Sequence, residues 1–311
     1  MKKILITGGA GFIGSHLCNF YLNKNFHVTC LDNLSSGNIN NLTKFQDNKN
    51  FQFVNFDISN EIEINNNFDL VLNFACPASP KYYLKHPLDT AAASIKGIYN
   101  ILDFCLKNNS VLLHASTSEV YGDPHIHPQI ESYFGNVNTV GPRSCYDEGK
   151  RVAEMLIYEY YKKFDLDCKI IRIFNTYGPN MDPKDGRVVS NFINQAIANE
   201  PITIYGDGKQ TRSFCFIDDL VKGIDSYLNL NEKFIGPINL GNPGEFDMNE
   251  LAARVLKLTN SSSKIVYKDL PTNDPLMRKP DITLATNKLN FNPKVDIHNG
   301  LIKTIKYFKN L

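Results

Sequence analysis

Short apolar runs alternate with amphipathic stretches through the first half of the chain. The apolar runs at 2–7, 26–31, 51–55, 68–74, 110–115 and 168–174 have the length of buried strands. Apolar positions at helical spacing predict helices at about 12–24, 88–107 and 146–164. Strands that alternate with helices form a parallel sheet covered on both faces. The pattern therefore predicts a doubly wound α/β fold.

Beyond residue 175 the elements become shorter and more mixed. We expect a helix near 187–199, strands near 202–205 and 211–216, and another helix near 218–230. We therefore predict a sheet domain over 1–175, with return segments near 215–240. The remainder, 176–311, is mainly a smaller substrate-binding lobe.

A glycine-rich turn follows the first apolar run. Gly8, Gly11 and Gly14 stand between a predicted strand and a predicted helix, as a dinucleotide fingerprint requires. Gly8 permits the tight turn, Gly11 lets the backbone approach a pyrophosphate, and Gly14 lets the helix pack on the strand. Asp32 ends the second run, where its carboxylate can accept hydrogen bonds from an adenosine ribose and repel the extra phosphate of NADP. These features predict a Rossmann-type domain that binds NAD, against the alternative that Asp32-Asn33 only begins a turn.

Tyr146 and Lys150 stand four residues apart on a predicted helix and so share one face. We expect the Lys150 ammonium to favour the Tyr146 phenolate, which makes this tyrosine a usable base. A solvated helix pair is the alternative, and the glycine motif argues against it. Thr117 follows the fifth predicted strand and completes a Thr117, Tyr146 and Lys150 set, whereas Ser116 is equally well explained as a strand end.

Composition narrows the class of protein. The net charge of +1 gives no indication of nucleic-acid binding, and no stretch is apolar and long enough to span a bilayer. The seven cysteines are scattered without a Cys-x-x-Cys pair, which suits reduced thiols. His125 and His127 precede Pro128 in a predicted loop and make a poor metal site. Because the first residues already form a strand, leaving no room for a signal peptide, we expect a cytoplasmic protein without a metal.

Several longer phrases resemble the extended short-chain dehydrogenase/reductase superfamily and, within it, the UDP-glucuronate decarboxylases. They cover essentially the whole chain: Cys76-Pro-Ala-Ser-Pro80, Ser116-Thr-Ser-Glu-Val-Tyr-Gly-Asp-Pro124, Gly141-Pro-Arg-Ser-Cys-Tyr-Asp-Glu-Gly-Lys-Arg-Val-Ala-Glu154, Arg172-Ile-Phe-Asn-Thr-Tyr-Gly-Pro179, Asp185-Gly-Arg-Val-Val-Ser-Asn-Phe192, Tyr205-Gly-Asp-Gly-Lys-Gln-Thr-Arg-Ser-Phe214 and Arg278-Lys-Pro-Asp-Ile282.

The resemblance implies oxidation of a UDP-sugar at C4, loss of carbon dioxide and return of the hydride to give UDP-xylose. Tyr146 would remove the C4 hydroxyl proton, and Thr117 with Tyr146 would stabilise the enolate. In the family, residues matching Ser118, Glu119 and Arg278 are implicated in decarboxylation and protonation. Relatives pair two subunits through helices equivalent to 88–107 and 146–164, so the resemblance also implies a homodimer.

The resemblance gives two sets of binding residues. The cofactor set adds Phe12, Ile13, Asn33, Ser36, Gly37, Asp57, Ile58, Ala75, Thr176 and Arg187 to the glycines, Asp32, Tyr146 and Lys150. Arg212 and Arg278 are candidates for the diphosphate because guanidinium groups bind phosphate in a bidentate manner. The substrate set further holds Pro77, Tyr83, Asn100, Glu119, Asn175, Val188 and Tyr205, with Val188 and Tyr205 framing uracil.

The chain departs from the decarboxylase pattern in three places. Ala92-Ala93-Ser94 stands where decarboxylases typically have Lys-Thr-Asn, and Asn180 stands in place of the arginine of Gly-Pro-Arg-Met. Decarboxylases also usually have an arginine after the second strand, where this chain has Asn38 or one of its neighbours. One hypothesis is that the enzyme takes a different nucleotide sugar or binds UDP-glucuronate weakly. A 4-epimerase is the first alternative. A 4,6-dehydratase is less favoured because Ser118 replaces the expected aspartate, and a non-catalytic NAD-binding scaffold would be expected to lose Tyr146 or Lys150.

Overall fold

The computed structural model describes residues 1–64, 67–269 and 277–311. Its centre is a seven-stranded sheet in the order β11-β6-β5-β4-β1-β2-β3, in which every neighbouring pair is parallel. The strands are β1 (Lys3–Thr7), β2 (His27–Asp32), β3 (Phe51–Asn55), β4 (Leu70–Asn73), β5 (Val111–Thr117), β6 (Cys168–Ile173) and β11 (Ile238–Leu240). The predicted doubly wound α/β fold is confirmed.

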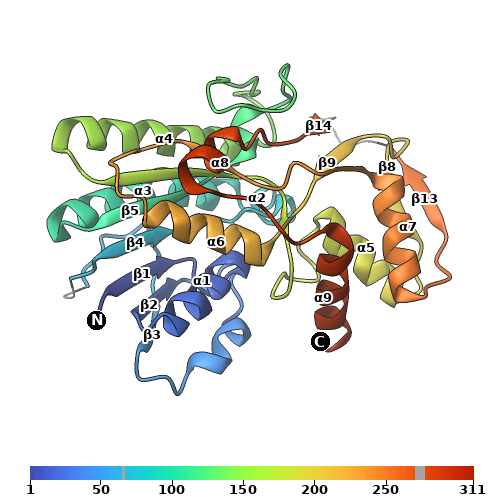
Figure 1. The fold of residues 1–311 in the computed structure, drawn as a ribbon, viewed down its shortest axis with the longest axis horizontal. Helices are drawn as coiled ribbons and strands as arrows, with labels where there is room; N and C mark the ends of the chain where they lie inside the picture. Colours follow the sequence, from blue (N-terminus) through green and yellow to red (C-terminus); the bar gives the residue numbers. More distant parts are fainter. Residues whose placement is uncertain (65–66, 270–276) are drawn as a thin grey trace.

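Helices cover both faces of this sheet (Figure 1). Along β1, Ile4 and Ile6 enter one core cluster while Leu5 enters a second, because successive strand side chains point to opposite faces. The first face carries α1 (Phe12–Asn23) and α6 (Ile217–Leu228), which contact each other, and the second carries α3 (Pro87–Asn108) and α4 (Ser144–Phe164). The remaining elements beside the sheet are η1 (Ile39–Phe45), α2 (Pro80–Tyr83), η2 (Ser118–Tyr121) and α8 (Thr283–Leu289).

The chain order reverses on either side of β1. β1 pairs with β2 on one edge and with β4 on the other, so the connections leave in opposite directions. Ligands of doubly wound sheets bind beyond the carboxyl ends of the strands at such a switch point. β5 is longer than the predicted strand at 110–115, because Ser116 and Thr117 continue the pairing with Arg172 and Ile173 of β6. The extension brings Thr117 to the edge where the fingerprint glycines lie.

A smaller lobe lies beyond the carboxyl ends of the strands, at the right of Figure 1. It contains α5 (Val188–Ile197), β8 (Ile202–Tyr205), β9 (Thr211–Ser213), β12 (Glu245–Asp247), α7 (Met248–Thr259), β13 (Ile265–Lys268), β14 (Met277–Arg278) and α9 (Ile297–Lys309). The single strand predicted at 211–216 is wrong. β9 pairs with β12 and β14, whereas β10 (Cys215–Phe216) pairs with β7 (Thr176–Tyr177), so the chain changes sheet at Phe214.

Candidate active site

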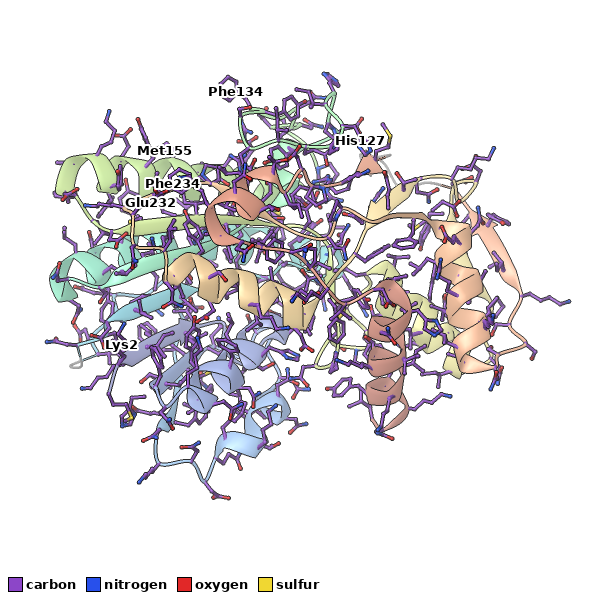
Figure 2. All side chains as sticks on the ribbon, viewed as in Figure 1. Lys2, His127, Phe134, Met155, Glu232 and Phe234 are labelled. Carbon is purple, nitrogen blue, oxygen red and sulfur yellow. The ribbon has the colours of Figure 1, made fainter. Side chains whose placement is uncertain are left out.

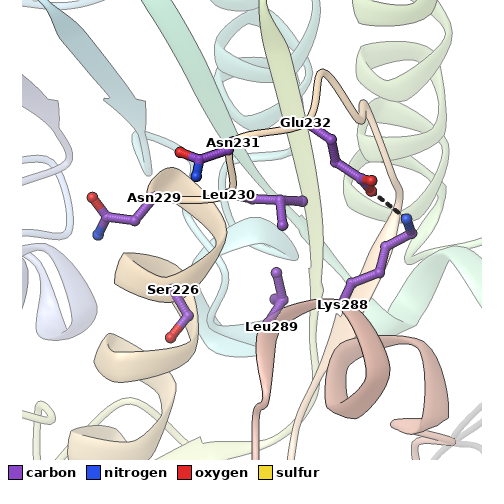
Figure 3. A pocket seen from close by; sticks show the side chains of 7 residues that line it. All are labelled: Ser226, Asn229, Leu230, Asn231, Glu232, Lys288 and Leu289. Atoms are coloured by element: carbon purple, nitrogen blue, oxygen red, sulfur yellow. Dashed lines mark hydrogen bonds and ion pairs between the residues drawn. The ribbon is translucent and has the colours of Figure 1, made fainter.

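A cleft of about 1680 Å³ runs between the main sheet and the smaller lobe. It is lined from Gly8 at the first turn, through Thr117 and Tyr146, to Arg212 and Arg278 in the smaller lobe. The sequence motifs that lie far apart along the chain therefore share one cavity. A second, shallow hollow holds none of the predicted site residues: it lies between the end of α6 and α8, and the ion pair of Glu232 with Lys288 crosses it (Figure 3).

The glycine turn gives the cleft a backbone wall. Gly8 has a φ of +68°, and a Cβ there would lie 2.5 Å from the carbonyl oxygen of Phe74, so only glycine fits. A Cβ at Gly14 would overlap the Gly8 carbonyl, which confirms the close approach of α1 to the turn. The N-terminal turn of α1 thus faces the cleft with Gly11, Phe12 and Ile13 on its lining. This arrangement can hold a pyrophosphate on backbone N–H groups.

Asp32 closes the far side of the same turn. Its two carboxylate oxygens accept hydrogen bonds from the backbone N–H groups of Ala10, at 3.0 Å, and Leu34, at 2.8 Å. Burial raises the pKa of Asp32, and these two hydrogen bonds oppose that rise. A Cβ at Gly37 would lie 2.8 Å from the carboxylate, so glycine keeps the space beside Asp32 open. The residues present fit the adenosine ribose of NAD.

All the other predicted cofactor residues lie on the cleft. Asn33 donates to Asp57 at 2.9 Å and so joins the ends of β2 and β3. Arg187 forms an ion pair with Asp185, and its guanidinium lies 6.0 Å from the ring centroid of Phe12. The cleft lining includes Asn33, Ser36, Gly37, Asp57, Ile58, Ala75, Thr176 and Arg187.

Tyr146 and Lys150 lie on the first turns of α4, against the end of β5. The Lys150 ammonium lies 5.9 Å from the Tyr146 ring centroid and donates to the Ala115 carbonyl at 2.7 Å. Thr117 caps η2 by accepting from the backbone N–H of Glu119. The structure therefore brings Thr117, Tyr146 and Lys150 together on the cleft, as the sequence predicts.

The electrostatics of Tyr146 differ from the expectation. Burial raises the pKa of Tyr146 well above its ordinary value, the neighbouring Cys76 thiol raises it further, and hydrogen bonding with Thr117 only opposes this. The role of Tyr146 as a base, favoured by Lys150 together with the positive nicotinamide ring of NAD⁺, stays a prediction.

Tyr83 shapes the wall beside Tyr146. The two rings stack with centroids 5.1 Å apart and an interplanar angle of 5°. The Cys145 thiol contacts the Tyr83 carbonyl, which ties α2 to α4. Tyr83 thus fixes the plane of the Tyr146 ring by packing against it. The sequence had assigned Tyr83 only to substrate binding.

Glu119 lies between two guanidinium groups. Arg143 Nη2 is 2.5 Å from Glu119 Oε2, and Arg278 Nη2 is 3.2 Å from the same oxygen. Burial alone would raise the pKa of Glu119, but the charges of Arg278, Arg143 and Arg212 lower it below its ordinary range. Arg143 also pairs with Asp147. Neither Arg143 nor Asp147 was predicted as a site residue. Arg143 nevertheless stands only three residues before Tyr146, within the Gly141–Glu154 segment that resembles the decarboxylases.

Arg278 is an internal residue. It is 1% exposed and donates to the carbonyl groups of Ser118 and Gly122 as well as to Glu119. These contacts hold the turn that carries Ser118 and Glu119, and they favour that role over the predicted grip on the diphosphate. Arg212 stands opposite Arg278 in the parallel pairing of β9 with β14 and also lines the cleft, so it is the better phosphate candidate.

The remaining substrate candidates divide into two groups. Pro77, Asn175, Val188 and Tyr205 line the cleft with Tyr83 and Glu119. Asn100 does not: its side chain donates to the carbonyl groups of Ile58 and Asn60, both at 2.8 Å, and joins α3 to the segment after β3. The prediction that Asn100 binds substrate is wrong because its amide is used inside the protein.

All three sequence departures have residues on the cleft lining, Asn38 among them. Ala92 and Ala93 on α3 face it with short side chains, whereas Ser94 is buried with its hydroxyl 3.2 Å from the Cys76 sulfur. Asn180 donates to Ser15 at 3.0 Å, at the start of α1. The wall formed by α3 is therefore uncharged at positions 92 and 93.

The fold and the cleft define an enzyme of the Rossmann class that uses a dinucleotide. The chain belongs to the NAD dependent epimerase/dehydratase family, whose model matches residues 4–241. It is 46% identical over 308 residues to UDP-glucuronic acid decarboxylase 4 of Arabidopsis thaliana, covering 99% of this chain and 68% of that protein. NAD is therefore the cofactor.

Solved structures agree with this assignment. UDP-glucose 4-epimerase of Thermotoga maritima has a TM-score of 0.91 at 28% identity, and 99% of both chains is covered. UDP-glucuronic acid 4-epimerase of Bacillus cereus, solved with UDP-glucuronic acid and NAD, has a TM-score of 0.88 at 29% identity over 99% of both chains.

Proposed function

We propose that the protein converts UDP-glucuronate to UDP-xylose and carbon dioxide with NAD as a retained cofactor. The observation that carries the proposal is the convergence of Thr117, Tyr146 and Lys150 with the arginine-held Glu119 on one NAD-compatible cleft. The likeness to UDP-glucuronic acid decarboxylases over nearly the whole chain supports this substrate.

The chain's own groups fit the chemistry at C4 of the sugar. When bound, NAD supplies the hydride acceptor that makes C4 a carbonyl and the donor that later restores it. Tyr146 takes the proton from the C4 hydroxyl, and Thr117 donates a hydrogen bond to the C4 oxygen as it gains charge. Lys150 holds the end of β5 beside the phenol through Ala115. Ser118 and Glu119 form the opposite wall, held by Arg278.

The binding roles follow from position. Arg212 is proposed to bind the diphosphate, Asn175 to hydrogen-bond the diphosphate or sugar, and Val188 with Tyr205 to flank the uracil. The glycine turn and Asp32 are proposed to bind the pyrophosphate and adenosine ribose of NAD.

One incubation tests the function. Purified protein with UDP-glucuronate and NAD is expected to give a UDP-pentose and released carbon dioxide, seen by mass spectrometry. The epimerase alternative, favoured by the likeness to a UDP-glucuronic acid 4-epimerase, gives UDP-galacturonate with no mass change. Tyr146→Phe protein is the control, and a product pool without pentose would reject decarboxylation.

We also propose that the protein is a homodimer. α3 and α4 contact each other along one face of the sheet, and they expose Leu88, Tyr99, Met155 and Tyr158 on their outer sides. Figure 2 marks Met155 on α4. Apolar side chains gathered on one pair of helices suit burial against a second copy. Light scattering is expected to give twice the chain mass, and Met155→Glu with Tyr158→Glu is expected to give a monomer.

A cytoplasmic location is proposed from the cysteines. All seven are free thiols, which a reducing compartment preserves. Cell fractionation is expected to recover the protein with cytosolic markers.

A further inference from the structure

Two neighbouring contacts join β5 to α4 directly beside Thr117. Lys150 Nζ donates to the carbonyl of Ala115 at 2.7 Å, and the Ser116 hydroxyl donates to Glu154 Oε1 at 2.5 Å. Lys150 and Glu154 are four residues apart, so they lie on one face of α4. Consecutive residues of the strand therefore bind consecutive turns of the helix that carries Tyr146.

Glu154 is itself fixed by Arg172 of β6. Arg172 Nε lies 3.0 Å from Glu154 Oε1, and Arg172 Nη2 lies 2.7 Å from Oε2, so the guanidinium binds both carboxylate oxygens. Arg172 pairs in register with Ser116 across β5 and β6. The side chains of Arg172 and Glu154 are only 12% and 14% exposed. A bidentate arginine–carboxylate pair has a defined geometry because its two parallel hydrogen bonds fix the relative orientation of the two groups.

Arg172 also reaches the far end of η2. Its Nη1 donates at 3.0 Å to the Tyr121 hydroxyl, and its guanidinium lies 4.8 Å from the Tyr121 ring centroid. The Tyr121 hydroxyl donates to Asn239 at 2.7 Å. Ser116 and Tyr121 are thus both held by one ion pair, and Thr117, Ser118 and Glu119 lie between these two points.

The position of this ion pair sets it apart from the substrate-binding groups. Neither Glu154 nor Arg172 lines the cleft, whereas the hydroxyl-bearing segment that they hold does. Removing charges from water is unfavourable unless hydrogen bonds compensate for it, and here both carboxylate oxygens are bonded. The pair therefore acts on the segment between Ser116 and Tyr121, not on a ligand.

We propose that Glu154 is a positioning residue, which with Arg172 and Ser116 sets the distance between the Thr117–Glu119 segment and Tyr146. The inference rests on the proposed function for its kinetic consequence, because catalysis depends on where Thr117 stands relative to the phenol. A displacement of the order of 1 Å in such a segment lowers turnover by roughly tenfold to a hundredfold.

The test compares two buried serines of the same strand region. Ser116→Ala removes the bond to Glu154, and Ser110→Ala removes a bond to the Phe68 carbonyl at the opposite end, just before β5. Ser110 and Ser116 are 2% and 3% exposed, so both variants lose one buried hydroxyl. We expect Ser116→Ala to lower kcat for UDP-glucuronate about tenfold with little change in KM, Ser116→Thr to restore it, and Ser110→Ala to leave it unchanged.

A second measurement needs no substrate. Hydrogen exchange at the backbone amides of Glu119 and Gly122, both bonded within η2, is expected to be faster in Ser116→Ala and Glu154→Gln than in Ser110→Ala. Equal exchange in all three proteins would overturn the inference whatever the substrate is. If η2 exchange rises while the wild type makes no UDP-xylose, the inference stands and the proposed function fails. If the wild type is active and Ser116→Ala keeps kcat within twofold, the function stands and the positioning role is rejected.

Discussion

The Arg143 guanidinium lies 2.5 Å from the Glu119 carboxylate, and this contact joins the start of α4 to η2. The Arg143 carbonyl accepts a hydrogen bond from the backbone N–H of Tyr146 at 3.0 Å. Arg143 therefore both holds Glu119 and begins the helical turn that carries the Tyr146 phenol. With Arg278 on the other side, Glu119 is kept as an anion. The two guanidinium groups therefore favour the carboxylate form of Glu119 over its protonated form.

Removal of the Arg143 charge should move the pH dependence of turnover. In Arg143→Gln the pKa of Glu119 is expected to rise toward its ordinary value, because one of the charges that lower it is lost. The acid limb of the kcat profile should then move to higher pH, and kcat at neutral pH should fall about tenfold or more. Arg151→Gln, whose arginine bonds the carbonyl groups of Val120 and Phe134, is the control. An unmoved acid limb would contradict the role given to Arg143.

Tyr146→Phe should abolish turnover without loss of NAD binding. General acid–base groups contribute about 10² to 10⁴-fold to rate, and the phenol is the group at the C4 hydroxyl. Tyr160→Phe is the matched control: it removes a hydroxyl of α4 that donates to Asp103, away from the cleft. Calorimetry with NAD and a turnover assay separate the two effects. Similar losses in both variants would argue for a structural role of Tyr146.

Asp147 should make the protein less stable as pH rises toward neutrality. Burial, followed by the charge of Glu119, raises the pKa of Asp147 to about 7, above the ordinary 3.8. The folded state therefore binds a proton that the unfolded state releases above about pH 4. This stabilisation is complete below pH 4 and is lost by about pH 7, on the order of 1.4 kcal/mol for each pKa unit. Asp147→Asn should remove that slope, so its Tm relative to wild type should rise between pH 4 and 7.

Ala92→Lys should strengthen the binding of UDP-glucuronate. Ala92 lines the cleft on α3, and an added ammonium there can meet the sugar carboxylate. An exposed ion pair contributes about 0.2 to 1 kcal/mol, so KM is expected to fall up to fivefold. Ala91→Lys, which adds the same charge at a neighbouring position outside the cleft lining, should leave KM unchanged. Tighter binding in both variants would indicate a general charge effect.

Asp32→Asn should relax the preference for NAD. The carboxylate repels the phosphate that distinguishes NADP, while Asn keeps an acceptor for the Ala10 or Leu34 amide. The ratio of the two dissociation constants, measured by calorimetry, is expected to shift toward NADP by about tenfold. A ratio unchanged from wild type would place the selectivity elsewhere in the turn.

The apolar runs and the glycine motif predicted most of the sheet because each of these patterns lies within one short stretch of sequence. The Gly8 turn, Asp32 at a strand end and the Tyr146–Lys150 pair are of this kind. The placement of Arg143, Glu154 and Arg172 was not predicted, since their contacts with Glu119, Ser116 and Tyr121 and with each other span 18 to 51 residues and only the folded packing brings them together. Asn100 shows the converse error: a polar residue on a helix near the cleft was assigned to the substrate, whereas its amide satisfies two backbone carbonyl groups.

The Arg278 side chain meets Ser118 across 160 positions of sequence. The residues predicted to bind the dinucleotide all lie before position 188, yet the inner support of the Ser118–Glu119 turn emerges from the ribosome near the end. The turn that carries Ser118 and Glu119 therefore gains this support only after nearly the whole chain has been synthesised. Premature termination ahead of β14 would remove Arg278 and leave this turn without its inner support.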